Sequence, residues 1–397
     1  MIQFPEGGSS LYLVQRPFWR PIIIILIATS LFLVACGTEI ASQNWPGITA
    51  DGDQVIIAYG NGVAAVDVAA QQLQWTFPDE LSPALLFYAP PSVSDDRIIL
   101  GDFGASGGMF SPQATITIYA LGRPQNAGAP PTLLWAGDDI ATDRIIAPPL
   151  QANGQIFVGT ADNHLYAIDA DSGELQWDFS TGHSIWAQPE YTEGFVYVAS
   201  LDNSVYALEP QSGELKWQTT LDGSVAGHPV LADDLLYVPS FDRQLHALDA
   251  TSGEEIWTAD ATNWVWGSPA VGNGTVYFGD IDGNIYAVSA QTGEQQWTAM
   301  AGGAIQSALL YDDGVIYVTS GQTEGEADER RGQVMALDAE RGEVLWQSET
   351  AVPVFSAPVL ADDSLVIVFL DGQSSTLNVY DREDGTLTWE FTLPAES

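Results

Sequence analysis

Short runs of apolar residues alternate with turn residues from about Trp45 to Phe391, and these runs show no helical periodicity. In one representative unit the runs cover residues 229–231, 236–238, 245–248 and 255–257. Asp-Asp or Asn-Gly pairs separate the first two runs of a unit, and Ser-Gly or Thr-Gly pairs separate the last two. The pattern predicts four short antiparallel strands in every unit, with first turns at the pairs 233–234, 273–274, 312–313 and 362–363.

A motif of the form Ala-x-Asp-x-x-x-Gly-x-x-x-Trp closes each unit and reveals the period of the repeat. The clearest copies follow one another at intervals of 40 residues. One copy has Gln71 in place of the glycine, and another is stretched by an insertion, rich in glycine and proline, after Leu121. The chain therefore holds eight repeats, and their terminal tryptophans are Trp75, Trp135, Trp177, Trp217, Trp257, Trp297, Trp346 and Trp389.

Repeats of this length with four strands each predict an all-β fold, namely an eight-bladed β-propeller with four antiparallel strands per blade. A β-sandwich lacks such a fixed period, and a solenoid would not place one aromatic residue at the end of every unit. We expect each tryptophan to be buried as a wedge between adjacent sheets, over the small alanine of its motif, and the glycine to adopt a positive φ. The acidic residues of the motif are expected to accept backbone N–H bonds in the turn, and they are Asp67, Asp169, Glu209, Asp249, Asp338 and Asp381.

The first residues of the chain have the pattern of a lipoprotein signal. Arg16 and Arg20 precede an apolar run, residues 22–35, and the sequence Leu-Val-Ala-Cys ends that run at Cys36. The run is shorter than the roughly 20 residues that a spanning helix needs, although an uncleaved membrane anchor with a buried Cys36 is the alternative. We expect a signal peptide at residues 1–35, a lipidated N-terminus and short linker at residues 36–44, and the propeller at residues 45–397.

Charge and cysteine content restrict the partners of the chain. From Cys36 onward it holds 51 acidic and 9 basic residues, a formal charge of −42, which excludes nucleic acid as a partner. The same charge repels anionic headgroups, so the membrane link must come from the lipid anchor alone. A salty or acidic habitat and a simply well-solvated surface both fit this composition. Cys36 is the only cysteine, and an intramolecular disulfide is therefore impossible.

The repeats resemble the tryptophan-docking repeats of pyrroloquinoline-quinone dehydrogenases, and a lipobox followed by eight such units resembles the BamB-like lipoproteins. That resemblance implies a propeller without the quinone, in a subunit of the machinery that inserts β-barrel proteins into the outer membrane. It implies a monomer within a larger complex that binds an envelope protein or an extended peptide segment. Gly37 follows the lipidated cysteine, where an aspartate would favour retention in the inner membrane of a diderm. The resemblance therefore also implies a location at the outer membrane and periplasm of a diderm, or at the outer leaflet of the cell membrane of a monoderm.

A quinone-dependent oxidoreductase is the alternative function, but the residues give it little support. The dehydrogenases use a vicinal disulfide and Ca²⁺, and no set of Glu, Asn and Asp residues can be assigned here as calcium ligands. The histidines lack metal-ligand spacing, and no phosphate-binding loop or nucleophile motif occurs. His164 and His246 are expected to pack on third strands, at the positions that Val205 and Ile285 occupy in sister repeats. We therefore expect no catalytic residue, no metal and no cofactor.

One side of the predicted ring concentrates unusual residues. In such blades the connections from the second to the third strand, and from the fourth strand to the next blade, emerge on the same side. Insertions near residues 104–112 and 322–333 lie on this side, and the opposite side has mostly short Asp and Gly turns. Plugging of the channel mouth is the alternative role for single aromatic residues, but together they predict a partner-binding face. The candidate residues are Arg144, His183, Trp186, His228, Trp264, Trp266 and Phe355, accompanied by Phe87 and Tyr88.

Overall fold

The computed structural model describes residues 46–394, apart from residues 82–84, 105–115, 125, 127, 323–329 and 372–373. The expectations for the signal segment, Cys36 and the linker lie outside these residues, as do most residues of the two insertions. The described residues form 32 strands in eight four-stranded antiparallel sheets. No helix capable of crossing a membrane occurs among them. The fold is the eight-bladed β-propeller that the repeats predict.

The first four blades each consist of four consecutive strands. Blade 1 comprises β1 (Gly47–Asp51), β2 (Gln54–Ala58), β3 (Val63–Asp67) and β4 (Gln72–Phe77). Blade 2 comprises β5 (Ser92–Val93), β6 (Arg97–Gly101), β7 (Ile118–Gly122) and β8 (Thr132–Gly137). Blade 3 comprises β9 (Leu150–Ala152), β10 (Gln155–Gly159), β11 (His164–Asp169) and β12 (Leu175–Ser180). Blade 4 comprises β13 (Glu190–Tyr191), β14 (Val196–Ala199), β15 (Ser204–Leu208) and β16 (Leu215–Thr220).

The last four blades repeat this order. Blade 5 comprises β17 (Val230–Ala232), β18 (Leu235–Ser240), β19 (Gln244–Asp249) and β20 (Glu255–Asp260). Blade 6 comprises β21 (Ala270–Gly272), β22 (Thr275–Gly279), β23 (Asn284–Ser289) and β24 (Gln295–Met300). Blade 7 comprises β25 (Leu310–Asp312), β26 (Val315–Gly321), β27 (Gly332–Asp338) and β28 (Val344–Thr350). Blade 8 comprises β29 (Val359–Ala361), β30 (Ser364–Asp371), β31 (Ser374–Asp381) and β32 (Leu387–Thr392).

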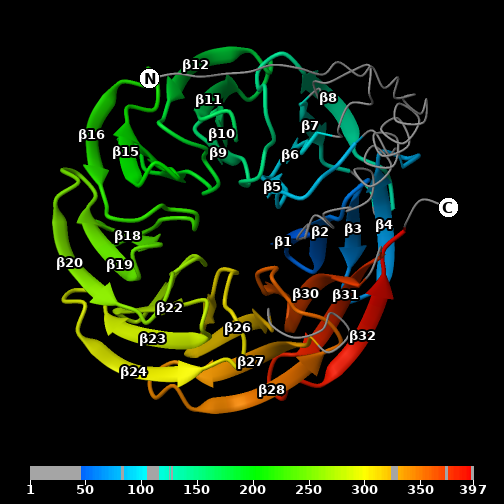
Figure 1. Ribbon diagram of the computed structural model, residues 1–397. Helices are drawn as coiled ribbons and strands as arrows, with labels where there is room; N and C mark the ends of the chain where they lie inside the picture. The colour runs from blue at the N-terminus through cyan, green and yellow to red at the C-terminus, as the bar shows by residue number, and fades with distance from the viewer. Residues whose placement is uncertain are drawn as a thin grey trace, which may run out of the picture. The chain divides into compact units, whose positions relative to one another are not determined.

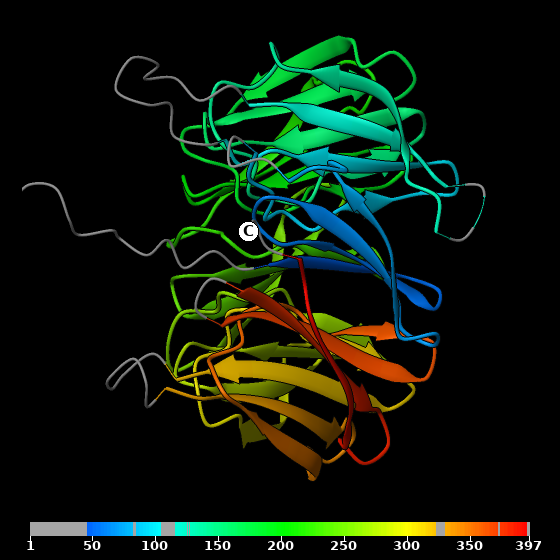
Figure 2. The same cartoon turned by 90° about the vertical axis from the view of Figure 1, so that its right-hand side faces the viewer.

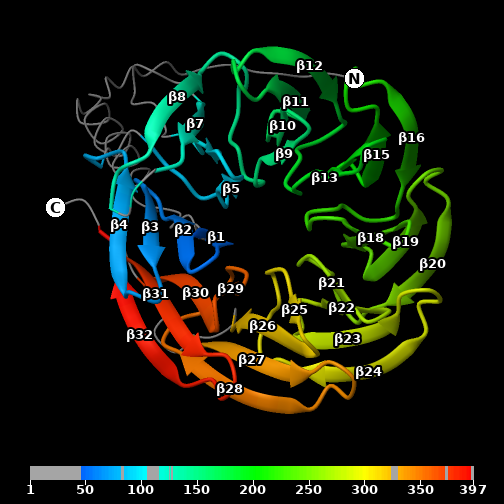
Figure 3. The same cartoon turned by 180° about the vertical axis from the view of Figure 1, so that it is seen from behind.

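The blades follow one another around a common axis (Figure 1). The first strand of each blade lies innermost, as β1, β5 and β9 show when the ring is seen from behind (Figure 3). The fourth strands, such as β16 and β20, form the outer edge. Seen from the side, the strands run between the two faces of the ring (Figure 2). The connections therefore divide between two faces as the sequence predicts, and one face carries the aromatic candidates.

The apolar core lies between neighbouring blades. Val205 and Tyr197 of blade 4 pack in one cluster with Val238 and Leu248 of blade 5, and all four are at most 1% exposed. Similar clusters fill the other junctions, because the second and third strands of a blade are buried on both faces. This stacking makes each sheet depend on both neighbours for its core.

Side-chain packing closes the ring. Among the described residues every sheet is built from consecutive strands, so no described strand is exchanged between the first and the last blade. Ile48 and Val55 of blade 1 share a cluster with Val366 and Leu377 of blade 8, and Leu393 joins that cluster after the last strand. The junction between blades 8 and 1 is therefore the one junction without a covalent connection.

The first turns of the blades are the tight hairpins that the sequence predicts, with one correction. Asp233 and Asp234 have φ values of 49° and 66°, as a two-residue turn with both central residues in the left-handed region requires. In blade 7 the turn lies one residue later than predicted, at Asp313 and Gly314, because β25 extends to Asp312. Gly314, at φ 82°, supplies the second left-handed position without strain.

Six of the motif tryptophans join one blade to the next. The indole of Trp217 lies against Gly253 of blade 5, where a Cβ would approach the ring to 2.5 Å, so the glycine serves close contact as well as positive φ. The indole nitrogen donates to the carbonyl of Ala250 at 3.1 Å. Equivalent bonds of 2.9–3.1 Å are made by Trp135, Trp177, Trp257, Trp297 and Trp346.

These tryptophans are less completely buried than the repeat motif predicts. Trp257 is 9% exposed, whereas Trp177, Trp217 and Trp297 are half-buried. Each lies on the outermost strand of its blade, so one edge of the indole faces solvent while the other covers the glycine of the next blade. In the same sheet, Ala207 lies directly opposite Trp217, and its small side chain leaves room for the indole.

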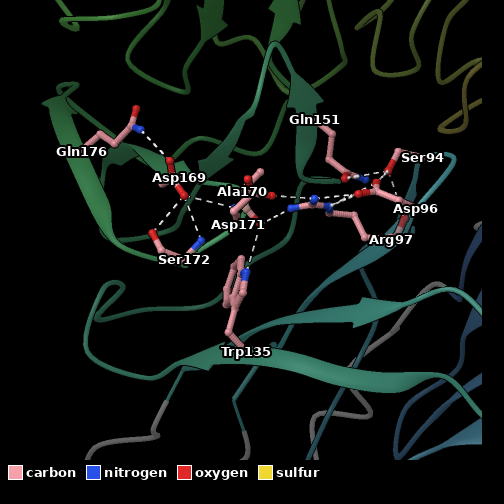
Figure 4. A network of polar contacts seen from close by, with 10 residues as sticks. All are labelled: Ser94, Asp96, Arg97, Trp135, Gln151, Asp169, Ala170, Asp171, Ser172 and Gln176. Atoms are coloured by element: carbon pink, nitrogen blue, oxygen red, sulfur yellow. Dashed lines mark hydrogen bonds and ion pairs between the residues drawn. The ribbon is translucent and has the colours of Figure 1, made fainter.

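The acidic residue of the motif stabilises the turn between the third and fourth strands. Asp169 accepts the backbone N–H groups of Asp171 at 3.1 Å and Ser172 at 2.8 Å (Figure 4), and the bonds from Ser172 lower the pKa of Asp169. The expectation is confirmed by backbone bonds at Asp67, Asp169, Asp249, Asp338 and Asp381. Glu209 differs, because its longer side chain accepts the hydroxyl hydrogen of Ser212.

Arg97 adds a polar connection between blades 2 and 3 on the face with the short turns. Its guanidinium lies 2.6 Å from Asp96 of its own blade and 2.8 Å from Asp171 of blade 3 (Figure 4). It also donates to the carbonyl of Ala170, which accepts the indole N–H of Trp135. The carbonyl of Ala170 in blade 3 thus accepts bonds from both Arg97 and Trp135 of blade 2.

Candidate functional site

An axial cavity of about 640 Å³ lies among the inner strands, and all eight blades contribute to its wall. Short apolar and small residues, such as Ala50, Val93 and Ala308, form much of the lining. Trp186 and Trp266, two of the candidate residues, bring large aromatic rings to it. Among the described lining residues none carries a carboxylate, and His228 is the only titratable group.

His228 connects three successive blades at this wall. Its Nδ1 lies 2.8 Å from the carbonyl oxygen of Gln188 in blade 4, so this nitrogen carries the hydrogen that it donates. Its backbone N–H donates to the hydroxyl of Ser268 in blade 6 at 2.9 Å. Its Nε2 lies 3.3 Å from a carboxylate oxygen of Glu190. His228 therefore helps to hold neighbouring blades together and also lines the cavity.

An aromatic strip leads from the rim into the cavity. Trp264 is 44% exposed and stacks on Phe241 at a centroid distance of 5.1 Å. Phe241 also contacts Trp266 at a centroid distance of 5.0 Å, and Trp266 lines the cavity. We call these three residues the rim strip. Phe241 is not among the residues predicted from the sequence, because it lies in the short loop between β18 and β19. Its one sequence signal is an aromatic residue where sister repeats have Ala161, Leu201 and Ile281.

A second aromatic group lies on the same face at blades 2 and 3. The guanidinium of Arg144 lies over the ring of Phe103 at 5.1 Å, and Phe103 meets Tyr88 edge to face at 5.2 Å. Arg144 and His183 are both exposed, as a binding role requires. His183 accepts the backbone N–H of Ser184 through Nδ1, which fixes the orientation of its ring.

Two candidates lie deeper than the sequence suggests. Phe87 is only 1% exposed and belongs to the core between blades 1 and 2, so its assignment to the binding face is wrong. Backbone bonds between Phe87 and Gly60 hold this segment against blade 1, which turns the ring inward. Phe355 is half-buried, and a Cβ on Gly321 would approach its ring to 2.8 Å.

Carboxylates in the loops of this face are bound within their own blades. The hydroxyls of Tyr166, Tyr206 and Tyr286 donate to Asp162, Asp202 and Asp280 at 2.6–3.0 Å. Burial alone would raise the pKa of Asp280, but hydrogen bonds from Thr262 and Asn284 outweigh it and hold that pKa low. These carboxylates order the loops, and none of them is arranged as a proton donor. Within the described chain, no group of three or more His, Cys, Asp or Glu residues could hold a metal.

In blade 5, His246 occupies the third-strand position that a tyrosine occupies in sister blades. The alignment expected from the sequence is therefore wrong. It pairs with Val238 as Tyr206 pairs with Val198, so it is not equivalent to Val205 or Ile285. The side chain is 4% exposed. Nε2 lies 3.0 Å from Asp242 and Nδ1 lies 2.8 Å from Glu255. Burial disfavours the imidazolium, but the hydrogen bonds to both carboxylates outweigh burial and raise the pKa of His246.

Substitution His246→Tyr should remove a pH dependence of stability. The raised pKa means that His246 stabilises the fold fully below its unfolded value of about 6.5 and loses that contribution as pH rises through the folded pKa. In the variant, a tyrosine hydroxyl can donate to Asp242 at all these pH values. Urea unfolding at a series of pH values should show the wild-type free energy of unfolding falling above about pH 6.5 relative to the variant. Parallel pH profiles for the two proteins would contradict this role.

The fold and the docked indoles define a tryptophan-docking β-propeller of the pyrroloquinoline-quinone type. The profile of the family described as outer membrane protein assembly factor BamB matches residues 131–225, 182–280, 202–309 and 282–397. These overlapping matches cover more than half of the chain, and the chain belongs to this family.

Solved structures share the fold at low sequence identity. BamB from Moraxella catarrhalis is 18% identical, with a TM-score of 0.64 over 85% of this chain and 96% of that chain. The computationally designed Ika8 protein is 15% identical, with a TM-score of 0.65 over 87% and 95%. A europium-containing methanol dehydrogenase is 16% identical, with a TM-score of 0.62 over 76% and 77%. These identities show the fold alone, and among curated protein sequences none matches.

Proposed function

We propose that this chain is a binding scaffold of the cell envelope, tethered through a lipid on Cys36, whose aromatic face docks an extended segment of another envelope protein. The rim strip carries the proposal. It places an exposed indole, Trp264, in stacking contact with Phe241 and continues through Trp266 into a cavity of about 640 Å³. Tryptophan dominates interface energetics, and rigid scaffolds commonly present binding residues on their loops.

The cavity lining favours a scaffold over a quinone enzyme. Calcium binds through oxygen ligands that include carboxylates, and the described lining residues offer none. The residues present therefore do not fit the Ca²⁺ and quinone that the resemblance to the pyrroloquinoline-quinone dehydrogenases implies. Small apolar residues such as Ala226, Ala308 and Ala357 suit the side chains of a peptide better.

A direct comparison separates these two functions. The purified protein is held with Ca²⁺ and pyrroloquinoline quinone, passed through gel filtration, and examined for the absorption spectrum of the quinone. The scaffold proposal expects no quinone band in the protein peak. A band at one quinone per chain would establish the oxidoreductase alternative.

The family supports the envelope assignment, since its printed description is that of an outer membrane protein assembly factor. A formal charge of −41 for the whole chain also disfavours adhesion to anionic lipid surfaces, which leaves the lipid anchor as the membrane link. The same charge favours a partner segment that is neutral or basic.

Site-specific photo-crosslinking in the native organism tests the face. A photoreactive amino acid replaces Thr262 or Asp222, which lie in blade connections on the aromatic face and are exposed. The matched control replaces Asp234 in the exposed turn between β17 and β18 on the opposite face. We expect the same protein adduct from both positions of the aromatic face and none from position 234. Adducts from position 234 alone would overturn the choice of face.

Substitution Cys36→Ala should release the protein from membranes. Thioether lipidation and N-acylation supply several acyl chains, whereas one chain anchors only marginally. Intact mass of the wild-type protein should show a chain that begins at Cys36 and carries lipid. If the Cys36→Ala protein still floats with membranes after high-salt washing, the anchor lies elsewhere.

A further inference from the structure

Three equivalent residues of successive blade connections line the axial cavity. Trp186, Ala226 and Trp266 each occupy the third position before the proline that precedes the first strand, in the connections into blades 4, 5 and 6. Blade 5 lies between blades 4 and 6 in the ring (Figure 3). The wall of the cavity therefore has an indole on each side of a residue with a single methyl group. We call these three residues the indole slot.

Direct contacts between the three connections hold the indole slot together. His228 donates from Nδ1 to a carbonyl of the connection into blade 4 at 2.8 Å, and from its backbone N–H to Ser268 of the connection into blade 6 at 2.9 Å. A Cβ on Gly227 would approach the carbonyl oxygen of Trp266 to 2.5 Å, so this glycine lets two connections touch. Sheets pack face to face at roughly 10 Å, so the indoles of blades 4 and 6 stand on either side of the space above Ala226.

The side chains that line the cavity favour an uncharged occupant that offers hydrogen-bond acceptors. Among the described lining residues none is Lys, Arg, Asp or Glu, and a charged group would lose its hydration there without a counter-charge. The indole of Trp186 carries a donor and no acceptor. The hydroxyl oxygen of Ser268 accepts the backbone N–H of His228, and its own hydrogen can be donated into the cavity.

The inner strands offer little edge for pairing with a partner strand. β13 has two residues, and β17 and β21 have three residues each. A segment that lies along such short edges leaves most of its backbone N–H groups without acceptors, which is costly in a buried site. Proline has no backbone N–H, and proline-rich segments in the polyproline II conformation dock in grooves lined by aromatic rings. Short edges and paired indoles together favour such a segment over a β-strand.

We propose that the cavity binds a proline-rich segment of the partner, with one proline ring seated above Ala226 between Trp186 and Trp266. This rests on the function proposed above and specifies the chemistry of the segment that docks on the aromatic face. Carbonyl groups of the segment accept hydrogens from Ser268 and from the indole of Trp186. Basic residues beside the prolines remain outside the cavity, where they meet a chain with a formal charge of −41.

Calorimetric titration of the purified protein with acetyl-Arg-Pro-Pro-Pro-Pro-Pro-Pro-Arg-amide tests the proposal. Its prolines extend about 19 Å, at roughly 3.1 Å per residue. The matched peptide acetyl-Arg-Val-Thr-Val-Thr-Val-Thr-Arg-amide has the same length and charge but favours the β conformation. We expect saturable binding of the proline peptide, and binding of the matched peptide that is weaker by about tenfold or more. Equal binding of the two peptides, or no binding of the proline peptide, would overturn the proposal.

Variants of the indole slot locate the bound peptide. Ala226→Trp fills the slot with the residue that the neighbouring connections hold at the same position, so it should fold and abolish binding. Ala136→Trp makes the same substitution at an exposed position of the outer strand β8 and should bind as the wild type does. Trp186→Ala should weaken binding by about tenfold or more even if Ala226→Trp does not fold. Wild-type affinity in Trp186→Ala, or in a folded Ala226→Trp protein, would show that the slot does not hold the proline ring.

Photo-crosslinking in the native organism separates this proposal from the proposed function. Asp222 and Thr262 lie in the same connections as Ala226 and Trp266, so adducts from positions 222 and 262 report on the segment beside the slot. Mass spectrometry of the crosslinked peptide should show several prolines. An envelope-protein adduct through a segment without proline would overturn this proposal and leave the proposed function in place. Binding of the proline peptide in the slot, without any envelope-protein adduct, would overturn the proposed function alone.

Discussion

Replacing Trp217 by alanine is expected to lower the free energy of unfolding by about 3–5 kcal/mol, the range for loss of a packed indole. The indole covers Gly253, donates to Ala250 at 3.1 Å and contacts the ring of Tyr197 at 5.8 Å. Its removal leaves a cavity between blades 4 and 5 that the rigid sheets cannot close. Urea unfolding followed by tryptophan fluorescence and circular dichroism measures the effect.

Lys216→Ala provides the matched control for this substitution. Lys216 precedes Trp217 on the same strand, is exposed and contacts Glu214 at 3.1 Å. An exposed ion pair contributes at most about 1 kcal/mol, so this variant should unfold within about 0.5 kcal/mol of the wild type. Unchanged unfolding of Trp217→Ala would contradict the docking role of the tryptophan motif.

The double substitution Trp264→Ala and Trp266→Ala is expected to abolish capture of the native partner without unfolding the ring. Both indoles contact Phe241, so their loss removes two of the three members of the rim strip. Truncation of a central interface tryptophan commonly costs 2 kcal/mol or more, about a thirtyfold loss of affinity per residue. Capture from detergent-solubilised native membranes, with the partner defined by crosslinking, measures the outcome.

Charge reversal on the opposite face supplies the control for this experiment. Asp234→Lys and Asp363→Lys alter exposed residues in turns between the first and second strands of their blades. These turns lie on the face opposite the rim strip. The two substitutions should leave capture intact, and circular dichroism should show native strand content in both sets of variants. Equal capture by the indole variants and the turn variants would show that the aromatic face is the wrong one.

The repeat made the fold predictable, because its physical requirements recur in every copy. A tryptophan, a small residue opposite it and a left-handed turn position are needed at each junction, so eight copies define eight blades and place most strands within a few residues. Single residues with no counterpart in the repeat were harder to place. Phe241 has no counterpart in the repeat that would mark it, and the prediction that Phe87 lies on the surface is wrong because its backbone bonds to Gly60 place it in the core.

The insertion in blade 2 and the register of His246 show what the pattern could not supply. A loop of irregular sequence has no periodicity, so the path of the chain after Gly122 could not be predicted from the repeat. His246 was aligned one position away from its true counterparts, since a buried histidine in place of tyrosine disguises the match. Its two carboxylate partners, Asp242 and Glu255, restore the polar contact that tyrosine makes elsewhere.

The closure of the ring makes blade 1 the unit that detaches most easily. In repeat architectures the total stability is close to a sum over nearest-neighbour interfaces. Blade 1 is covalently continuous with blade 2 alone, and among the described residues neither Trp75 nor Trp389, which flank it, donates an interblade indole bond. Partial opening would therefore release blade 1 while the other seven blades remain stacked.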